Sequence, residues 1–374
     1  MEFLIYYVLI PLAVLTILVF VHEMGHFLVA RYNNVRVEIF SIGFGKELFG
    51  FNDKHGTRWK FAAIPMGGYV KMFGEGENIE EEEKERPLTD AEKEVSFHHK
   101  RLGQRAAIVF AGPFVNFLFA VLVFASLFFV TGEPTPLSQV GTVQAGSAAE
   151  EAGITPGDRV ISIDGKDVVL FEDLRQVVMK SANVSLSMEI IRDDVQLTII
   201  ATPKAHTRQE NGVESQIGLL GVTPDPNLVE YLPLGIFDSL LMGVDRTYGF
   251  TVTILKTVGQ MFSGAVSRQD LGGPIRIAQM AGDMAQGGLP TFFFFLAALS
   301  INLGLINLFP IPMLDGGHLL FYFFEAILGR PVNEKVQEYS FRFGLALILL
   351  LMVFVFWNDF ENIKLIEKIR NLVS

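Results

Sequence analysis

The sequence contains no cysteine. Disulfides and cysteine-ligated zinc sites are therefore excluded, and any metal site has to use histidine and carboxylate ligands. Charged residues are also scarce, at 19% of the 374 residues, and acidic residues outnumber basic residues by 41 to 30. An acidic balance without a basic patch predicts that nucleic acid is not a partner of this protein.

The sequence also lacks the features of a cleavable signal peptide. Met1 and Glu2 supply no positively charged segment, and no small-residue cleavage site follows the apolar run that begins at Phe3. Half of the residues are apolar, 34 are Phe, and the mean hydropathy is +0.37. This composition predicts a polytopic α-helical membrane protein with room for one soluble domain.

Four uncharged apolar stretches are long enough to form transmembrane helices. They cover residues 3–21, continuing as helix through His26 towards Ala30, and residues 106–130, 289–314 and 343–357. The last stretch is short for a span, and we expect it to extend at both ends. Asn116, in the second stretch, is interpreted as a hydrogen-bonding residue between helices.

Lysine and arginine residues near the span ends predict the orientation of the chain, because cytoplasmic flanks carry an excess of positive charge. With four spans, three clusters of basic residues fall on one side of the membrane: Arg31 with Arg36, Lys100 with Arg101 and Arg105, and Arg330 with Lys335 and Arg342. We expect that side to be cytoplasmic and both termini to lie outside the cytoplasm.

Residues 35–73 alternate polar and apolar side chains and are punctuated by glycine, which predicts strands joined by tight turns. Because this segment lies between the first two spans, we expect a membrane-associated β-loop on the cytoplasmic side, within a first region of residues 1–132. The acidic run that follows, Glu80 to Glu83 with Glu85, is interpreted as a solvated loop.

Residues 133–226 are predicted to form one inserted α+β domain outside the cytoplasm. Strand patterns surround a Gly-Ser-Ala-Ala-Glu-Glu-Ala-Gly sequence at 146–153, Gly-Asp and Asp-Gly turns at 157–158 and 164–165, and a helical stretch at 172–179. This order resembles a PDZ domain of the circularly permuted bacterial kind, and PDZ domains bind extended peptides at a sheet edge. The alternative is a β-sandwich fragment without a ligand.

Residues 227–288 are largely apolar but contain Asp238, Asp245, Arg246 and Lys256. These charges favour amphipathic helices at the membrane surface over a fifth span. The Leu-Gly-Gly-Pro sequence at 271–274 is expected to interrupt this region. The final region, residues 289–374, contains the last two predicted spans.

The strongest chemical signal is the sequence His22-Glu23-Met24-Gly25-His26 at the end of the first apolar stretch. His-Glu-x-x-His is a zinc-hydrolase signature, because residues four apart share one helix face and two such histidines can bind one metal ion. Glu23 lies beside that face and is the expected general base, acting on a water whose pKa zinc lowers to about 7. Charged side chains at membrane depth are costly, so this position indicates hydrolytic chemistry within a membrane.

Catalytic zinc usually takes three protein ligands, so the histidine pair needs a third. Asp315 is the best candidate, because it ends a long uncharged run as the first motif does, and with four spans both fall near the cytoplasmic face. Pro310 and Pro312 before it, and the glycines after it, would break a helix. Irregular backbone at membrane depth suits a cavity that admits water and an unwound substrate.

The remaining histidines are weaker candidates. Four of them lie in soluble stretches: His55, His98, His99 and His206. The adjacent pair at 98–99 is interpreted as part of a loop. His318, one turn after Asp315, is expected to support the site rather than to bind the metal.

These residues together resemble the site-2 protease family of intramembrane zinc metalloproteases. The resemblance runs along nearly the whole chain, through residues 22–26, 43–45, 65–69, 112–116, the PDZ motif, 271–274 and 307–317. It implies that His22, His26 and Asp315 bind zinc and that Glu23 is the catalytic base. It also implies a membrane-reentrant β-loop at 36–73 and substrate-binding positions further along the chain: Asn302, Asn307, Pro310 and Pro312.

The family resemblance further implies a location and a class of substrate. Bacterial members act in the inner membrane on single-span proteins already trimmed by a first protease, such as anti-sigma factors, or on leftover signal peptides. Their PDZ part is thought to exclude untrimmed proteins. The best-known members carry two PDZ modules, whereas residues 135–224 hold only one.

Two other classes of function compete with proteolysis. One is a non-proteolytic, zinc-binding membrane scaffold whose PDZ module recruits partners, and the other is a metal transporter that uses intramembrane histidines. Only the protease requires Glu23. A transporter would require polar residues along a path through the spans, and the sequence offers only the two motifs.

Overall fold

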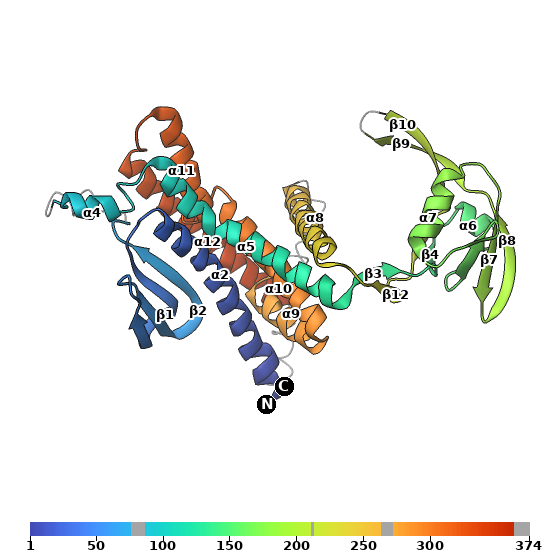
Figure 1. Ribbon diagram of the computed structural model, residues 1–374, viewed down its shortest axis with the longest axis horizontal. Helices are drawn as coiled ribbons and strands as arrows, with labels where there is room; N and C mark the ends of the chain where they lie inside the picture. Colours follow the sequence, from blue (N-terminus) through green and yellow to red (C-terminus); the bar gives the residue numbers. More distant parts are fainter. Residues whose placement is uncertain (76–86, 211–212, 263–271, 363–374) are drawn as a thin grey trace. The chain divides into compact units, whose positions relative to one another are not determined.

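The computed structural model describes residues 1–75, 87–210, 213–262 and 272–362. The chain divides into two compact units (Figure 1). Unit 1 contains Met1–Leu127 and Ile236–Ser374, and unit 2 contains Phe128–Gly235. The predicted acidic loop at 80–85 and Leu271 lie outside the described residues.

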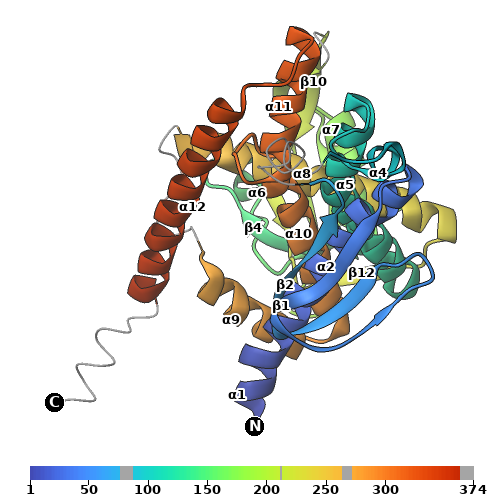
Figure 2. The ribbon, with the colours of Figure 1, turned by 90° about the vertical axis from the view of Figure 1, so that its left-hand side faces the viewer.

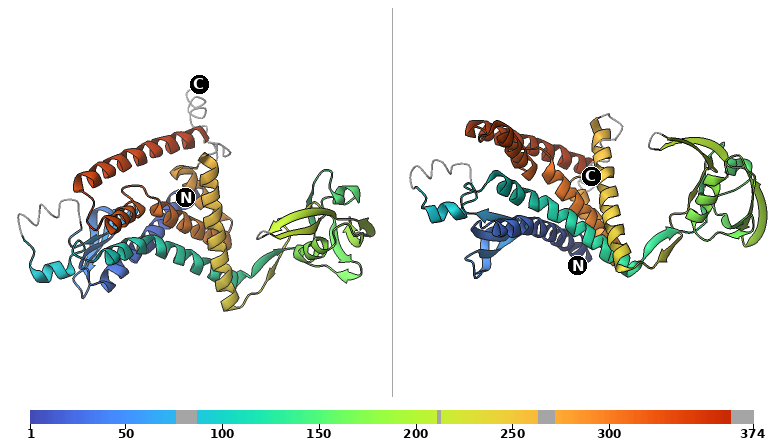
Figure 3. Two further views of the ribbon diagram at one scale, coloured as in Figure 1. Left: turned by 90° about the horizontal axis from the view of Figure 1, so that it is seen from above. Right: turned by 45° about the horizontal axis from the view of Figure 1, so that its top comes forward.

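Four helices of the described residues are long and apolar enough to cross a membrane: Glu2–Tyr32, Leu102–Thr131, Leu289–Leu308 and Lys335–Asp359. The first contains α1 (Glu2–Leu4), the π-helical turn η1 (Ile5–Leu9) and α2 (Ile10–Tyr32), and the others are α5 (Leu102–Thr131), α10 (Leu289–Leu308) and α12 (Glu334–Asn362). The prediction of four spans is confirmed, including the extension of the fourth. Seen from two directions, α2, α5 and α10 run side by side (Figure 3).

The predicted third span is too long at its C-terminal end. Helix α10 stops at Leu308, residues 309–314 are irregular, and Asp315 begins a new helix, α11 (Asp315–Leu328), instead of ending the span. Proline explains the difference: Pro310 and Pro312 lack the N–H that a continuing helix requires, and each disfavours helical backbone in the residue before it.

Small residues allow α2 and α5 to approach closely. A side chain at Gly25 would clash with the backbone of Ala111, so only glycine fits this contact. On the α10 side of α2, Val14, Leu18 and Leu296 form a buried cluster. Close packing through small residues is how helices associate in lipid, where burial of apolar surface gives little driving force.

Between the first two spans lies a long antiparallel hairpin, β1 (Val37–Asn52) and β2 (Arg58–Met72), as the alternating pattern predicted. Figure 2 shows this hairpin alongside α2. Its anchor is a buried cluster around Phe40, which stacks on Trp59 and also packs against Phe27 of α2. A short helix, α4 (Asp90–Val95), follows the hairpin and starts with a capping box at Thr89.

Unit 2 is a β-rich domain inserted between α5 and α8. Its first and last strands, β3 (Glu133–Pro136) and β12 (Val229–Leu232), pair with each other where the chain enters and leaves. Residues 229–232 are therefore a strand, although they fall in the region predicted as membrane-surface helices. The other elements are β4 (Val140–Val143), α6 (Ala148–Glu151), β5 (Arg159–Ile163), β6 (Lys166–Asp167), α7 (Phe171–Lys180), β7 (Leu186–Arg192), β8 (Val195–Ala201), β9 (Lys204–Glu210), β10 (Val213–Leu219) and β11 (Val222–Pro224).

The Gly-Asp turn at 157–158 has a structural role in unit 2. Asp158 is fully buried, and its carboxylate accepts hydrogen bonds from the backbone of Thr155 and from both Nε and an Nη of Arg192. Burial opposes ionisation of Asp158, but these hydrogen bonds outweigh it and hold the pKa of the carboxyl below its usual value. The turn is thereby tied to β7, which carries Arg192.

We expect Asp158→Asn to destabilise unit 2 by about 2 kcal/mol at neutral pH, because it removes charge-assisted hydrogen bonds from a buried site. A carboxyl whose folded pKa is depressed stabilises the fold above its unfolded pKa of about 3.9 and loses that effect as the pH falls through the folded pKa. Hydrogen exchange of β7 in the full chain measures this, and Asp194→Asn, in an exposed turn, is the control. Equal protection in both variants at pH 7 would contradict the assignment.

The region after unit 2 forms two helices, α8 (Ile236–Phe262) and α9 (Pro274–Gln286). The start of α9 is stabilised by Asp359 of α12. The buried carboxylate of Asp359 accepts hydrogen bonds from three backbone N–H groups at this end of the helix, those of Gly273, Ile275 and Arg276. Neither helix is among the four candidate spans. Their position at a membrane surface stays a prediction.

Candidate metal centre

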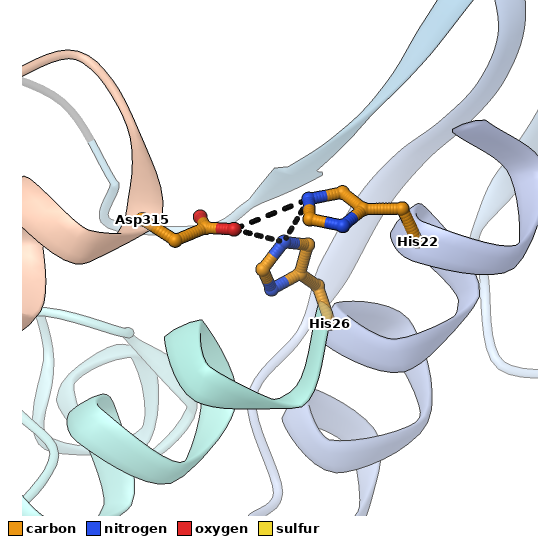
Figure 4. Close-up of side chains that lie close together, drawn as sticks. All are labelled: His22, His26 and Asp315. Carbon is orange, nitrogen blue, oxygen red and sulfur yellow. Dashed lines mark hydrogen bonds and ion pairs between the residues drawn. The ribbon is translucent and has the colours of Figure 1, made fainter. Parts of the chain in front are cut away.

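The two histidines of the motif lie one turn apart on α2 and point the same way (Figure 4). Both are buried, with 8% of each residue exposed. Their Nε2 atoms are 3.2 Å apart, which is possible because residues four apart lie on one face of a helix. The pair therefore presents two nitrogen ligands to a single point.

Asp315 reaches the same point from α11 (Figure 4). Its Oδ2 atom lies 3.1 Å from His22 Nε2 and 3.5 Å from His26 Nε2. Figure 4 shows the three side chains converging from two separate segments of the chain. Among the described residues, these three form a group whose ligand atoms all lie within 4.8 Å of one another. The structure therefore brings the three predicted ligand residues together, and their binding of a metal ion stays a prediction.

The backbone around Asp315 is shaped to deliver this side chain. Met313 has a left-handed φ of 86°, which is uncommon for a residue other than glycine and turns the chain just before α11. Gly316 and Gly317 then pack so tightly on the 308–312 backbone that any side chain would collide with it. The Asp-Gly-Gly sequence thus places the carboxylate at the start of a helix that folds back on the loop before it.

The spacing of the three ligand atoms matches zinc. For a tetrahedral zinc ion about 2.0–2.2 Å from each ligand, neighbouring ligand atoms lie about 3.3–3.6 Å apart. The observed separations of 3.1, 3.2 and 3.5 Å lie within about 0.2 Å of that range. Asp315 Oδ2 is buried and accepts no hydrogen bond from the described residues, so it is available to a cation.

The second nitrogen of each imidazole also has a partner. His26 Nδ1 lies 2.9 Å from the carbonyl oxygen of Ile108, and it can only donate to that acceptor. The proton is therefore on Nδ1, and Nε2 keeps its lone pair for a metal ion. Partners of this kind fix the orientation of metal-binding histidines. His22 Nδ1 lies 3.1 Å from the side-chain nitrogen of Asn116.

Glu23 is beside the histidine pair and faces the hairpin. Its Oε2 atom accepts a hydrogen bond of 3.0 Å from the backbone N–H of Val70, in β2. The carboxylate is therefore held between α2 and the edge of β2. A carboxylate next to a metal position has the chemistry of a general base.

Comparisons with known proteins decide the family. The sequence pattern of peptidase family M50 matches residues 10–351. The chain belongs to peptidase family M50. A Mesorhizobium japonicum protein named "Putative zinc metalloprotease mll0638" is 44% identical over 365 residues, covering 94% of this chain and 98% of that protein. The regulator of sigma-E protease RseP of Salmonella typhimurium is 33% identical over 448 residues, covering 93% of this chain and 97% of RseP.

Membership of family M50 makes this protein a zinc metalloprotease, and the four candidate spans among its described residues indicate a multi-pass membrane protein. The resemblance noted from the sequence motifs is confirmed. The donor set of two imidazoles and one carboxylate is also the kind of set that catalytic zinc uses when it leaves one position open.

The other predicted site residues lie in the part of the chain that precedes Asp315. Asn302 and Asn307 are on α10, and Pro310 and Pro312 are in the irregular segment that follows it. No hydrogen bond within the described part of the chain joins either asparagine to His22, His26 or Asp315. The ring of His318 packs against Phe341 of α12, with ring centroids 5.2 Å apart.

Several contributors to the site were not assigned to it from the sequence. They include the Ile108 carbonyl, the Val70 N–H, the Asn116 amide and the pair Arg105–Glu325. Arg105 of α5 forms an ion pair of 2.5 Å with Glu325 of α11, and both side chains are at least 85% buried. Because α11 begins with Asp315, this pair fixes the far end of the helix that carries the carboxylate. Arg105 had a signal, as a basic residue flanking a span, whereas backbone groups leave none.

Gly112 of α5 faces the two imidazoles of this M50 peptidase. The Cβ atom of an alanine at 112 would lie within 3.0 Å of both rings, closer than real Cβ contacts. We expect Gly112→Ala to displace a histidine and to weaken zinc binding at least as much as loss of an outer partner does, about 10–100-fold. Zinc affinity by chelator competition measures the effect. Gly103→Ala, also in α5 but with open space around it, should bind zinc normally; equal affinities would contradict this packing.

Proposed function

We propose that this M50 peptidase is an intramembrane endopeptidase. Its substrates would be single-span membrane proteins, such as a trimmed anti-sigma factor or a remnant signal peptide, cut near the cytoplasmic end of the span. The observation that carries the proposal is the convergence of three zinc-type ligand atoms, two of them on a candidate span. A buried hydrolytic centre on such a helix is best suited to substrates in the membrane.

In this proposal His22, His26 and Asp315 hold the zinc ion and Glu23 is the general base. Bound zinc would polarise the scissile carbonyl and acidify water. Glu23 would take a proton from the attacking water and deliver it to the leaving nitrogen, and the Val70 N–H holds its carboxylate in place for both transfers.

The hairpin offers a way to hold an unwound substrate. A helical peptide bond is shielded by its own turn, so the substrate has to become extended before it is cut. In a two-stranded hairpin each strand has an unpaired edge, to which an extended chain can add by main-chain hydrogen bonds. Since Val70 contacts Glu23, a chain added along that part of β2 would pass beside the base. The predicted roles of Asn302, Asn307, Pro310 and Pro312 in substrate binding fit the 302–312 backbone that leads to Asp315.

We further propose that unit 2 is a PDZ-like domain that excludes untrimmed proteins. It has a cavity of about 520 Å³ between α7 and the β10–β11 region, lined by Phe171, Leu174, Val178, Ile217, Leu220 and Val222. A groove between a helix and a strand edge is where PDZ domains bind extended peptides. We place unit 2 outside the cytoplasm and the hairpin inside, with the protein in the bacterial inner membrane.

Because the sequence contains no cysteine, a single introduced cysteine can report on which side of the membrane a position lies. A single cysteine at Asp194 in unit 2 should react with a membrane-impermeant thiol reagent in intact cells, whereas one at Lys54 in the β1–β2 turn should react only after lysis. Both positions are exposed. Reaction of the Lys54 position alone in intact cells would reverse the orientation.

The proposed activity is tested in vesicles with a single-span substrate in two forms, with and without its outer domain. The proposal expects cleavage of the trimmed form and little of the untrimmed form. A zinc-binding scaffold would cut neither. Equal cleavage of both forms would remove the exclusion role from unit 2 but leave the protease activity standing.

A further inference from the structure

Asn116 is a fully buried polar residue beside the metal centre. It has no exposed surface, and its side-chain nitrogen lies 3.1 Å from His22 Nδ1. Ser300 of α10 donates a hydrogen bond of 2.9 Å to its backbone carbonyl, and α10 packs tightly here through Gly304. Its interpretation as a residue that hydrogen-bonds between helices is correct, but the partner of its amide is a histidine of the site.

The two ends of this amide are not equally satisfied. With nitrogen facing His22, the amide oxygen is buried without a hydrogen-bond partner among the described residues. That arrangement also makes His22 Nδ1 the acceptor, which places the imidazole proton on Nε2, the atom that faces Asp315 and His26. A protonated Nε2 cannot bind a metal ion.

A half-turn of the amide changes this arrangement, because the oxygen and nitrogen of an asparagine side chain occupy nearly equivalent positions. The oxygen then accepts a hydrogen bond from His22 Nδ1–H, and His22 Nε2 is left with its lone pair. This is the arrangement that Ile108 imposes on His26 by its carbonyl oxygen. The tautomer of His26 would then be fixed by a backbone carbonyl, and that of His22 by the side-chain oxygen of Asn116.

We infer that Asn116 is a positioning residue for zinc: its amide oxygen faces His22 Nδ1 and fixes the tautomer in which Nε2 binds the metal. The inference rests on the proposed zinc ligands. It makes α5 a supporting wall of the site, with the Ile108 carbonyl, Gly112 and Asn116 spaced four residues apart along one face of the helix.

The test compares Asn116→Asp with Asn116→Leu in the purified full-length protein, with zinc affinity measured by chelator competition. The aspartate keeps an acceptor for Nδ1–H and should hold zinc as tightly as the parent or more tightly. The leucine offers no acceptor and should weaken binding about 10–100-fold, the usual effect of losing such a partner. If Asn116 served helix packing alone, the order would reverse, because a buried carboxylate costs more in a membrane helix than leucine does.

Two further variants separate the possible failures. Ser300→Ala removes the hydrogen bond to the Asn116 backbone without touching the amide, and should leave zinc affinity unchanged. His22→Ala tests the ligand set itself. Loss of affinity in His22→Ala with none in Asn116→Leu would overturn only the role of Asn116, whereas full affinity in His22→Ala would overturn the proposed ligands.

Discussion

Replacing Glu23 by Gln should lower the rate of substrate cleavage by about 10²–10⁴-fold, the usual contribution of a general base. Glutamine keeps an oxygen that can accept the hydrogen bond from Val70, so the hairpin should stay in place. It cannot take a proton from water at neutral pH. The measurement is the initial rate of cleavage of a trimmed single-span substrate in vesicles, together with the zinc content of the enzyme.

The zinc content makes this result specific. Glu23 is not one of the three converging ligand residues, so the variant should retain one zinc per chain. A slow, zinc-loaded enzyme is the expected result. Parent-like cleavage by the zinc-loaded variant would show that another group is the base, and loss of zinc would show that Glu23 supports the metal instead.

Replacing Asp315 by Asn should cause a large loss of zinc affinity, because Asp315 is one of the three proposed direct ligands. The carboxylate supplies the negative charge of the ligand set, and asparagine is a neutral and weaker ligand of similar shape. Since loss of an outer partner alone costs about 10–100-fold in affinity, loss of a direct ligand should exceed about 100-fold. Elemental analysis after dialysis against a mild chelator measures the occupancy.

Asp283→Asn is a matched control for this change. Asp283 is an exposed aspartate of α9 that accepts a hydrogen bond from the hydroxyl of Tyr7, and it is not one of the three ligand residues. Its variant should keep parent-like zinc content. If Asp315→Asn also keeps its zinc, Asp315 is not a direct ligand, whatever its distance from the histidines.

The sequence predicts the histidine half of the site well because that half is local. Helical spacing puts His22 and His26 on one face wherever the helix lies, and Glu23 beside them. Asp315 was predicted by the need for a third ligand and by its place at the end of an apolar run. Its helix was not: the chain breaks after Leu308, and Asp315 opens α11 instead of closing the span.

The supporting parts of the site could not be predicted in the same way. The Val70 N–H and the Ile108 carbonyl are backbone groups, which every residue carries, so their role depends on how the hairpin and α5 pack against α2. Asp359 shows the same limit in the fold. It satisfies the start of α9 from 86 residues away, and neither segment alone contains the information that they meet.

The proposed zinc site cuts peptide bonds that begin within the membrane. Its most direct test is mass spectrometry of the products formed from a trimmed single-span substrate by the zinc-loaded enzyme in vesicles, with Glu23→Gln as the blank. We expect a cut inside the apolar segment, towards its cytoplasmic end, that is absent from the blank. A cut only in soluble flanking sequence, or the same intramembrane cut in the blank, would contradict it.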